Sequence, residues 1–501
     1  MDMILEQVLL LFFISCSVDI GLSRRIDPDN SIVWGPGLEA QFSTPARFFY
    51  IQAVDDEMNN ITESVGKDAF VFTIEEKFSS GDSVGIWTQV LDRQDGSYIA
   101  RYRLYGSMND LVLKVKHQGK HVAGSPYLLS GSLHGSNCDC PEPDIDKWSR
   151  NLHCPQSFKQ IADDLSLFPK IDMRRVNTEY RRRFNQPGSI SLCHYTVIDN
   201  KIYRRTQGKH VGFKMFSDSI LLTLARQVKL PDMEFLSNLG DWPLEFENVN
   251  PLPILSWCGS DETNDIVLPT YEMTESALET MGRQMLDMLS VQANASPRWE
   301  DKIAKGFWRG RDSRQERIDL VKMSIQNPEL INASLTRMFF FPHDKNEVGE
   351  LVEHISFFDF FKYRYQINVD GTVAAYRFPY LLAGNSVVFK QESNYYEHFY
   401  RELQPFTHYI PFKSDLSDLE QHLQWAKDND DEAKRISRNA QNYARDYLQA
   451  NHILCYYVQL FKEYAKLMVT KPKIYPDMEL VPQPSTPHEC RCGSHKVKEE
   501  L

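Results

Sequence analysis

The sequence predicts two unlike folded parts, an all-β module followed by a larger α/β part. Residues 32–129 hold short alternating runs rich in β-branched and aromatic side chains, which is typical of a β-sandwich. Residues 363–389 read as strand, tight turn, helix and strand, the order of a βαβ unit. Residues 137–155 lie between these parts and combine proline, charge and three cysteines, which indicates a stapled linker.

The N-terminal residues 1–23 resemble a signal peptide. Val8–Ile14 is an unbroken apolar run followed by small residues, with cleavage expected after Ser17 or Ser23. Asp2 and Glu6 stand where basic residues are usual. The run is too short to span a bilayer, and no apolar stretch of about 18 residues follows, so we expect no transmembrane segment.

The chain ends in Lys498-Glu499-Glu500-Leu501, which resembles the KDEL class of retrieval signal. A charged tail could end in this way by chance. Together with the signal peptide, the ending predicts retention in the endoplasmic-reticulum lumen and a retrieval receptor as partner.

Cysteine use fits an oxidising lumen. Of nine cysteines, Cys16 lies in the expected signal peptide, and the remaining even number suggests disulfides of undetermined connectivity. A metal site at the two Cys-x-Cys pairs is the weaker interpretation, because their spacing is shorter than in zinc sites. Three sequons predict N-glycosylation, at Asn60, Asn294 and Asn332, and Pro297 after Ser296 weakens the second.

The β module is expected over residues 24–132, with the linker over 133–155. Three segments resemble a filamin-type immunoglobulin repeat: Trp34–Leu38, Asp95–Tyr98 and His121–Tyr127. Because no cluster of acids, histidines or nucleophiles suggests chemistry there, it is either a binding or positioning module or a spacer that assists folding. The expected strands are Arg47–Val54, Ala69–Ile74, Val84–Asp92, Ser97–Tyr105 and Leu111–His117.

The α/β part is long enough for two lobes, expected over residues 156–295 and 296–470, before a tail at 471–501. The acidic run Asp428–Glu432 is interpreted as a solvated loop rather than a metal motif. Helical patterns cover Gln156–Leu167, Ser217–Gln227, Glu275–Ala293 and Leu419–Leu448.

A basic segment, Lys302–Arg317, interrupts an acidic chain. It gathers six cations, whereas the whole chain has 56 basic and 68 acidic residues and a net charge of −12. Arginine forks bind phosphate oxygens in pairs, and the overall acidity disfavours a long nucleic acid. This predicts a phosphorylated ligand, and the alternative is a solvated helix start. The turn after the strand Tyr365–Val369 would offer backbone N–H groups to the same phosphate.

Four segments together resemble the Rumi-type protein O-glucosyltransferases, in the order that the family shows. The likeness runs from about Cys154 to about Met468, and the KDEL motif-containing members are the most similar, type 2 more than type 3. The segments are LPDMEFLSNLGDWP, KGFWRGRDSRQER, INVDGTVAAYRFPYLLAGNSVVF and LQPFTHYIPFKSDLSDL.

The resemblance implies a GT-B fold, in which two Rossmann-like lobes enclose a nucleotide-sugar. It also implies transfer of glucose, and possibly xylose, from UDP-glucose or UDP-xylose to serine of folded EGF-like repeats. The expected acceptors are secreted or membrane proteins such as Notch and fibrillins. A different interpretation is a catalytically silent lectin or adaptor that binds secretory clients through its filamin-type domain.

The chemistry requires a carboxylate that removes the serine proton, and Asp241 follows an apolar strand-like segment and Gly240. In isolation, such an aspartate is more often a turn residue. The resemblance assigns it the role of base and assigns UDP-sugar contacts to Arg309, Thr372, Val373, Ala374, Ala375, Tyr376 and Arg377. It places the acceptor near His210, Gly212, Lys214, Glu279 and Gln284, although these residues differ from those of the best-known members.

One base and one displacement predict inversion at the sugar carbon, because no second nucleophile is identified. We expect no cofactor and no metal, with the arginine cluster supplying the positive charge that a cation would otherwise provide.

Overall fold

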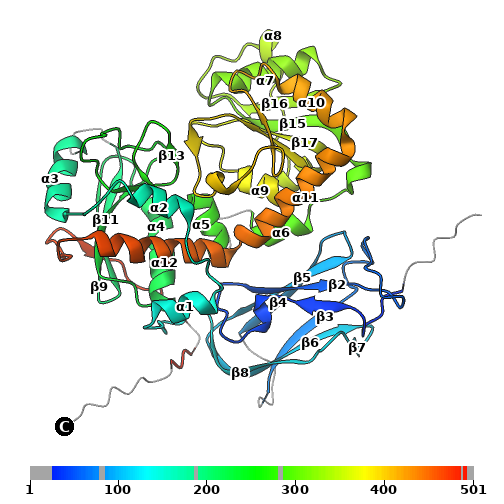
Figure 1. The fold of residues 1–501 in the computed structure, drawn as a ribbon, viewed down its shortest axis with the longest axis horizontal. Helices are drawn as coiled ribbons and strands as arrows, with labels where there is room; N and C mark the ends of the chain where they lie inside the picture. The colour runs from blue at the N-terminus through cyan, green and yellow to red at the C-terminus, as the bar shows by residue number, and fades with distance from the viewer. Residues whose placement is uncertain (1–24, 78–84, 185–189, 280–285, 487–488, 493–501) are drawn as a thin grey trace, which may run out of the picture.

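The computed structural model describes residues 25–77, 85–184, 190–279, 286–486 and 489–492. The β domain packs beside an α/β part of two lobes, each built around its own sheet (Figure 1). The expected signal peptide, the retrieval motif Lys498–Leu501 and Gln284 lie outside the described residues. Within those ranges, no helix combines the length and apolar character needed to cross a membrane.

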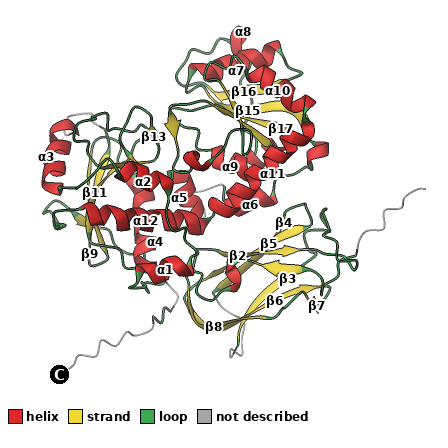
Figure 2. Cartoon of the chain, viewed as in Figure 1, coloured by secondary structure: helices red, strands yellow, loops and turns green. Residues whose placement is uncertain are grey.

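The N-terminal domain is a sandwich of two sheets, drawn in yellow in Figure 2. All five expected strands are present, and β6 begins four residues before the expected Leu111. One sheet has the order β1-β2-β5-β4 and the other joins β3, β6, β7 and β8. The bounds are β1 Ile32–Trp34, β2 Arg47–Gln52, β3 Val71–Glu76, β4 Ile86–Asp92, β5 Ser97–Leu104, β6 Ser107–His117, β7 Lys120–His121 and β8 Tyr127–His134, with a 3-10 turn η1 at Pro36–Leu38.

Alternation of buried and exposed residues produces this sandwich. In β3, Phe72 and Ile74 face the core while their neighbours face solvent. The turn between β4 and β5 requires glycine at Gly96, where φ is +80° and a Cβ would lie 1.9 Å from the Ile61 carbonyl oxygen. The expectation of a β-sandwich is therefore confirmed.

The first lobe contains a six-stranded sheet in the order β14-β12-β11-β9-β10-β21. Strands β11, β12 and β14 are parallel, whereas β9, β10 and β21 pair antiparallel. The strands are β9 Leu192–Ile198, β10 Lys201–Gln207, β11 Met233–Asn238, β12 Ile254–Ser256, β14 Ile266–Val267 and β21 Glu479–Leu480. The helices of this part are α1 Ile145–Asn151, α2 Lys159–Leu165, α3 Met173–Phe184, α4 Lys214–Gln227, α5 Tyr271–Leu278 and the returning α12 Ala450–Leu467.

The second lobe has an all-parallel sheet in the order β16-β15-β17-β18-β20. Strand β17, helix α9 and strand β18 form the expected βαβ unit. Strands are β15 Ile303–Arg311, β16 Ile331–Arg337, β17 Tyr363–Asn368, β18 Val387–Gln391 and β20 Ile410–Phe412. Helices are α6 Met288–Ala293, α7 Gln315–Gln326, α8 Lys345–Val348, α9 Phe378–Ala383, α10 Leu419–Asp428 and α11 Asp430–Tyr447, with 3-10 turns η2 Trp299–Asp301, η3 Phe357–Lys362 and η4 Tyr400–Glu402.

A two-stranded clasp joins the two lobes. Gly259 and Ser260, strand β13, follow the first lobe's β12 and pair antiparallel with Tyr396 and Tyr395, strand β19. Strand β19 belongs to the connection between β18 and β20 of the second lobe. Because backbone bonds cross from one lobe to the other, the clasp fixes the two sheets relative to each other at this point.

The expected continuous helix Glu275–Ala293 is wrong. Helix α5 ends at Leu278, where Glu279 adopts a left-handed conformation with φ of 46°. Helix α6 starts separately, and the Asp287 side chain caps it by accepting a hydrogen bond from the Ser290 N–H. The prediction failed because the apolar pattern of the sequence continues past Leu278, whereas the helix ends there.

The acidic run at residues 428–432 is also not a loop. Asp430, Asp431 and Glu432 form the first turn of α11, where acidic side chains favour the positive end of the helix. Asp430 accepts hydrogen bonds from the Trp299 indole at 2.9 Å and from Arg364 at 2.7 Å. The run is therefore structural.

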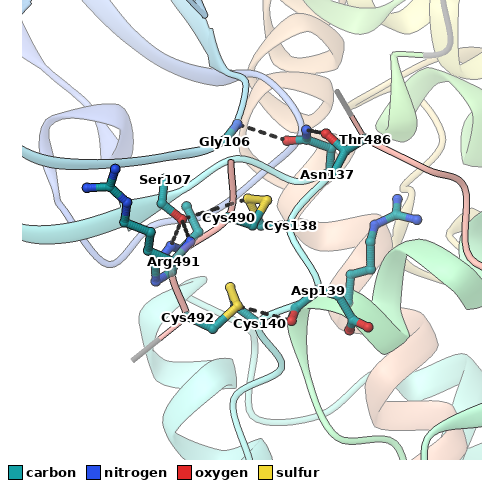
Figure 3. Close-up of a disulfide and its surroundings, with 12 residues drawn as sticks. Gly106, Ser107, Asn137, Cys138, Asp139, Cys140, Thr486, Cys490, Arg491 and Cys492 are labelled. Carbon is teal, nitrogen blue, oxygen red and sulfur yellow. Dashed lines mark hydrogen bonds between the residues drawn. A yellow bond between two sulfur atoms is a disulfide. The ribbon is translucent and has the colours of Figure 1, made fainter. Parts of the chain in front are cut away.

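Disulfides tie the tail to the linker (Figure 3). Cys138 pairs with Cys490 and Cys140 with Cys492, so the two Cys-x-Cys segments bind each other and not a metal. A third bond joins Cys154 to Cys455 of α12. Of the eight expected cysteines, Cys193 and Cys258 stay free and buried.

The tail is part of the folded structure. Residues 479–480 add strand β21 to the first sheet, and Val481 is buried. Further along, the Glu489 carbonyl accepts a hydrogen bond from the Ser107 N–H of the sandwich at 2.9 Å. The boundary expected at residue 470 therefore falls before the end of the packed chain.

Candidate active site

Asp241 lies just beyond the carboxyl end of β11, at the edge that faces the second lobe. The Asn238 side chain shapes the turn by donating to the Trp242 carbonyl at 2.6 Å and accepting from the Gly240 N–H at 2.9 Å. The Cys258 thiol donates to the Asp241 carbonyl at 3.4 Å. These contacts hold the backbone and leave the carboxylate for another partner.

The carboxylate of Asp241 is set up to accept a proton. It is half-buried, and its Oδ1 has no hydrogen-bond partner within the described ranges. Burial raises the pKa of Asp241, while the positive charge of Arg311, at the end of β15 in the other lobe, lowers it. A desolvated carboxylate opposite a cation is a suitable general base.

Arg317 holds the ends of two strands together in the second lobe. Its guanidinium donates to the carbonyl oxygens of Asp370 at 2.7 Å, Val369 at 3.2 Å and Arg311 at 3.1 Å. The side chain is buried, and burial followed by the charge of Arg377 lowers its pKa to about 9. These carbonyl oxygens accept hydrogen bonds but carry no full charge, and the carboxylate of Asp370 offsets only part of the positive charge of Arg317.

The segment 371–377, called here the 371–377 loop, connects the end of β17 to α9. The Gly371 N–H donates to the Val373 carbonyl at 2.8 Å and closes a tight turn. In the described part of the chain, the backbone N–H groups of residues 372–376 donate to no acceptor. Val373 to Tyr376 are buried, whereas Thr372 and Arg377 are half-buried. Consecutive unused N–H groups beside arginines form an anion-binding arrangement.

The Arg309 side chain, on strand β15, makes its hydrogen bonds within the second lobe. Its guanidinium donates to the Asn332 carbonyl and side-chain amide at 2.9 and 2.8 Å and to the Trp308 carbonyl at 2.8 Å. It also lies over the Phe307 ring. The carbonyl of Arg309, in turn, accepts from Arg377 at 2.6 Å. Arg309 therefore braces Arg377, and its donor contact stays a prediction.

The sequence shows all six cations of residues 302–317, but it did not predict that Arg311 and Arg317 belong to the site. The available signal was position: Arg311 ends the strand, and Arg317 lies in the first turn of the following helix. In a parallel sheet both places face the carboxyl edge. The sequence does not reveal that Arg317 is buried whereas Arg311 is exposed; only the structure shows this difference.

The expected acceptor residues separate into two groups. Residues 210–214 precede and begin α4, with His210 and Gly212 exposed. The neighbouring Phe213 packs against Tyr271 at 5.1 Å between ring centroids, and Tyr271 packs against Tyr376 at 5.4 Å. This aromatic chain connects the expected acceptor loop to the site around Asp241.

Glu279 belongs to the second group and lies against the β-sandwich. Its carboxylate is 3.6 Å from Arg101, and its carbonyl accepts from Arg103 at 3.1 Å. Burial raises the pKa of Glu279 to about 7. The structure thus connects Phe213, in the expected acceptor loop, to Tyr376 of the 371–377 loop through Tyr271, but it places Glu279 at the domain interface.

The three sequons differ in their surroundings. Asn60 is exposed, and Asn294 is exposed at the end of α6. Asn332 is half-buried in β16, where its amide donates to the Tyr363 hydroxyl at 2.8 Å and accepts from Arg309. A glycan on that amide nitrogen would disturb these contacts, so glycosylation fits Asn60 and Asn294 better.

Two family models match the chain. Glycosyl transferase family 90 covers residues 149–499, and the Filamin/ABP280 repeat covers residues 25–128. Protein O-glucosyltransferase 2 of Danio rerio is 56% identical over 94% of both chains. Protein O-glucosyltransferase 3 of Homo sapiens is 46% identical over 95% of this chain and 94% of its own.

A type 1 relative is more distant. Protein O-glucosyltransferase 1 of Homo sapiens is 30% identical over 65% of this chain and 84% of its own length. The greater similarity to the type 2 relative than to the type 3 relative confirms the expected subgroup. The chain belongs to glycosyl transferase family 90 and carries a filamin repeat ahead of its transferase domain.

Proposed function

We propose that the protein is a UDP-sugar-dependent O-glucosyltransferase that modifies serine in folded EGF-like repeats, such as those of Notch and fibrillins. The observation that carries the proposal is the placement of two features on the facing ends of the two lobes, close enough for Arg311 to act on Asp241. Among the described residues, Oδ1 of the half-buried Asp241 accepts no hydrogen bond, and the opposite lobe presents Arg311, Arg317 and the N–H groups of residues 372–376, which donate to no acceptor there. The carboxylate of Asp241 suits the removal of a proton from a hydroxyl, and the cations and N–H groups of the second lobe suit the binding of the diphosphate that leaves.

The mechanism is a single displacement. Asp241 accepts the serine hydroxyl proton while the oxygen forms a bond to the anomeric carbon of glucose. The bond from that carbon to the UDP oxygen breaks on the opposite face, and UDP leaves with the bonding electron pair. Arg311, Arg317 and the loop N–H groups stabilise the negative charge on UDP. Attack opposite the leaving group inverts the configuration at the anomeric carbon.

The donor assignment is tested by a transfer assay. Purified protein is incubated with UDP-glucose or UDP-xylose and a folded EGF-like repeat, and the repeat is weighed by mass spectrometry. We expect one added sugar that is lost when the acceptor serine is replaced by alanine. The absence of transfer with either donor, although UDP binds, would support the silent lectin or adaptor instead.

We also propose that the enzyme acts in the endoplasmic-reticulum lumen, without a metal. Three disulfides and the sequons suit an oxidising lumen. Deleting Lys498–Leu501 should send active enzyme into the medium, and complete intracellular retention of a folded deletion variant would contradict retrieval. Transfer should also continue in excess EDTA, since arginines supply the positive charge. Loss of transfer that manganese restores would contradict metal independence.

A further inference from the structure

Helix α5 connects the active site to the filamin repeat. Its first residue, Tyr271, contacts the 371–377 loop through Tyr376, and burial, followed by the nearby charge of Asp241, raises the pKa of its hydroxyl. The helix ends at Leu278, and Arg101 and Arg103 of strand β5 contact the next residue, Glu279. Because a helix of two turns is stiff, a shift at the sandwich moves the residues beside Asp241.

Arg101 joins the sandwich to both α5 and α6. Its guanidinium donates to Asp287 at 3.0 Å and to Ser290 at 3.2 Å, and lies 3.6 Å from Glu279. The Nε–H donates to Gln89 of β4 at 2.8 Å, so the fork is also held from the sandwich side. Arg101 is buried. A planar fork with this many fixed partners specifies one orientation of the two domains.

An apolar contact supports the same junction. Leu289 of α6 is 4% exposed and belongs to a cluster that otherwise comes from the sandwich. Figure 1 shows α6 between the second lobe and the β2–β5–β4 sheet. The sandwich members of the cluster are Phe42, Phe48, Tyr50 and Ile99. The interface therefore combines a partly buried charge network centred on Arg101 with an apolar contact, unlike a loosely tethered module.

We infer that the filamin repeat is a positioning element of the transferase, in which Arg101 fixes the end of α5 and the start of α6 and so keeps Tyr271 in place beside Asp241. The inference rests on the proposed function and adds a role for the N-terminal domain. Arg101 touches neither substrate nor base, so its effect is on acceptor geometry. The groups proposed to face the phosphates, Arg311, Arg317 and the N–H groups of the 371–377 loop, lie in the second lobe, and among the described residues the Arg101 side chain contacts none of them.

The test compares variants of the full-length protein. Arg101→Ala removes the fork, Arg101→Lys keeps the charge, and Lys114→Ala is a control on the other sheet, where Lys114 pairs with Glu75. For each variant we measure the melting temperature, UDP affinity by calorimetry, hydrolysis of UDP-glucose without acceptor, and kcat and KM for a folded EGF-like repeat.

Arg101→Ala should lower kcat/KM for the repeat by about tenfold or more, as misplacement of a reacting group does. UDP affinity and the rate of UDP-glucose hydrolysis without acceptor should stay within about twofold of wild type, because a twofold change corresponds to a negligible free-energy difference. The kcat/KM of Arg101→Lys should lie between the values of wild type and Arg101→Ala, and the kcat/KM of Lys114→Ala should equal that of wild type.

A further variant separates position from simple destabilisation. Arg101→Ala leaves the half-buried carboxylates of Glu279 and Asp287 near each other without this cation, which lowers stability. Adding Glu279→Gln and Asp287→Asn to Arg101→Ala removes that repulsion and should recover the melting temperature without recovering kcat/KM.

Three outcomes would overturn the inference: normal transfer by Arg101→Ala, an equal loss of UDP affinity and transfer, or full recovery of transfer in the triple variant. If wild-type protein binds no UDP and transfers no sugar, the proposed function itself fails, and the positioning role fails with it.

Discussion

Replacing Arg317 with lysine preserves a positive charge but removes the geometry that holds the 371–377 loop. The arginine fork reaches three carbonyl oxygens, of Asp370, Val369 and Arg311, at 2.7, 3.2 and 3.1 Å. A compact ammonium on a flexible stem cannot reach all three in these directions. We expect it to keep one contact and lose the other two.

The magnitude follows from those lost contacts. A hydrogen bond to a charged group contributes about 1.5–3 kcal/mol, and losses at one buried side chain are not additive. Part of the loss appears as lower stability, because the free carbonyl oxygens are buried. If about 1.4–3 kcal/mol falls on ligand binding, UDP affinity drops about 10- to 150-fold.

The assay is calorimetric titration of UDP into Arg317→Lys, with the free energy of unfolding measured on the same preparation. Arg182→Lys is the matched control, because Arg182 is an exposed helix residue paired with Glu179. Unchanged UDP affinity in a folded Arg317→Lys protein would refute the reasoning, since the loop would then not depend on this fork.

Three further predictions concern charge and cross-linking. Arg311→Ala removes the charge that lowers the pKa of Asp241, so the pH below which kcat/KM falls should move upward. If the acidic side of the pH–rate profile does not move, the charge of Arg311 does not act on the catalytic base. Burial raises the pKa of Glu279 from 4.5 to about 7, so this carboxyl favours folding while protonated and the free energy of unfolding falls as pH rises between those values. Glu279→Gln should flatten that dependence in denaturant titrations, and an identical slope would contradict it. Replacing Cys154 and Cys455 with serine opens a link across 301 residues and should reduce the free energy of unfolding by about 2–5 kcal/mol, whereas no change in urea midpoint would show that the bond contributes nothing.

The elements that the sequence predicts well are those with local signals. Alternation predicts the five sandwich strands, and the strand–turn–helix order at residues 363–389 predicts the β17–α9–β18 unit. Asp241 is likewise correctly placed at a strand end, because the apolar run and Gly240 are contiguous with it. Within each of these elements, the signal comes from residues that are close neighbours in the sequence.

The missed features depend on contacts between distant residues. The role of Glu279 at the domain interface depends on Arg101, far away in sequence, and the folded tail depends on disulfides with a separation of 352 residues. The choice among arginines failed for the same reason, since burial of Arg317 against Asp370 is a tertiary contact. No local pattern contains this information.

The most direct test of the proposed activity is Asp241→Asn, which preserves shape but removes the proton acceptor. UDP affinity by calorimetry and sugar transfer to a folded EGF-like repeat by mass spectrometry are measured on one preparation. UDP affinity should survive, because the phosphate-facing groups belong to the other lobe, while transfer falls about 10²- to 10⁴-fold. Near-normal transfer by the asparagine variant would contradict the account, and loss of both binding and transfer would show a structural aspartate instead of a base.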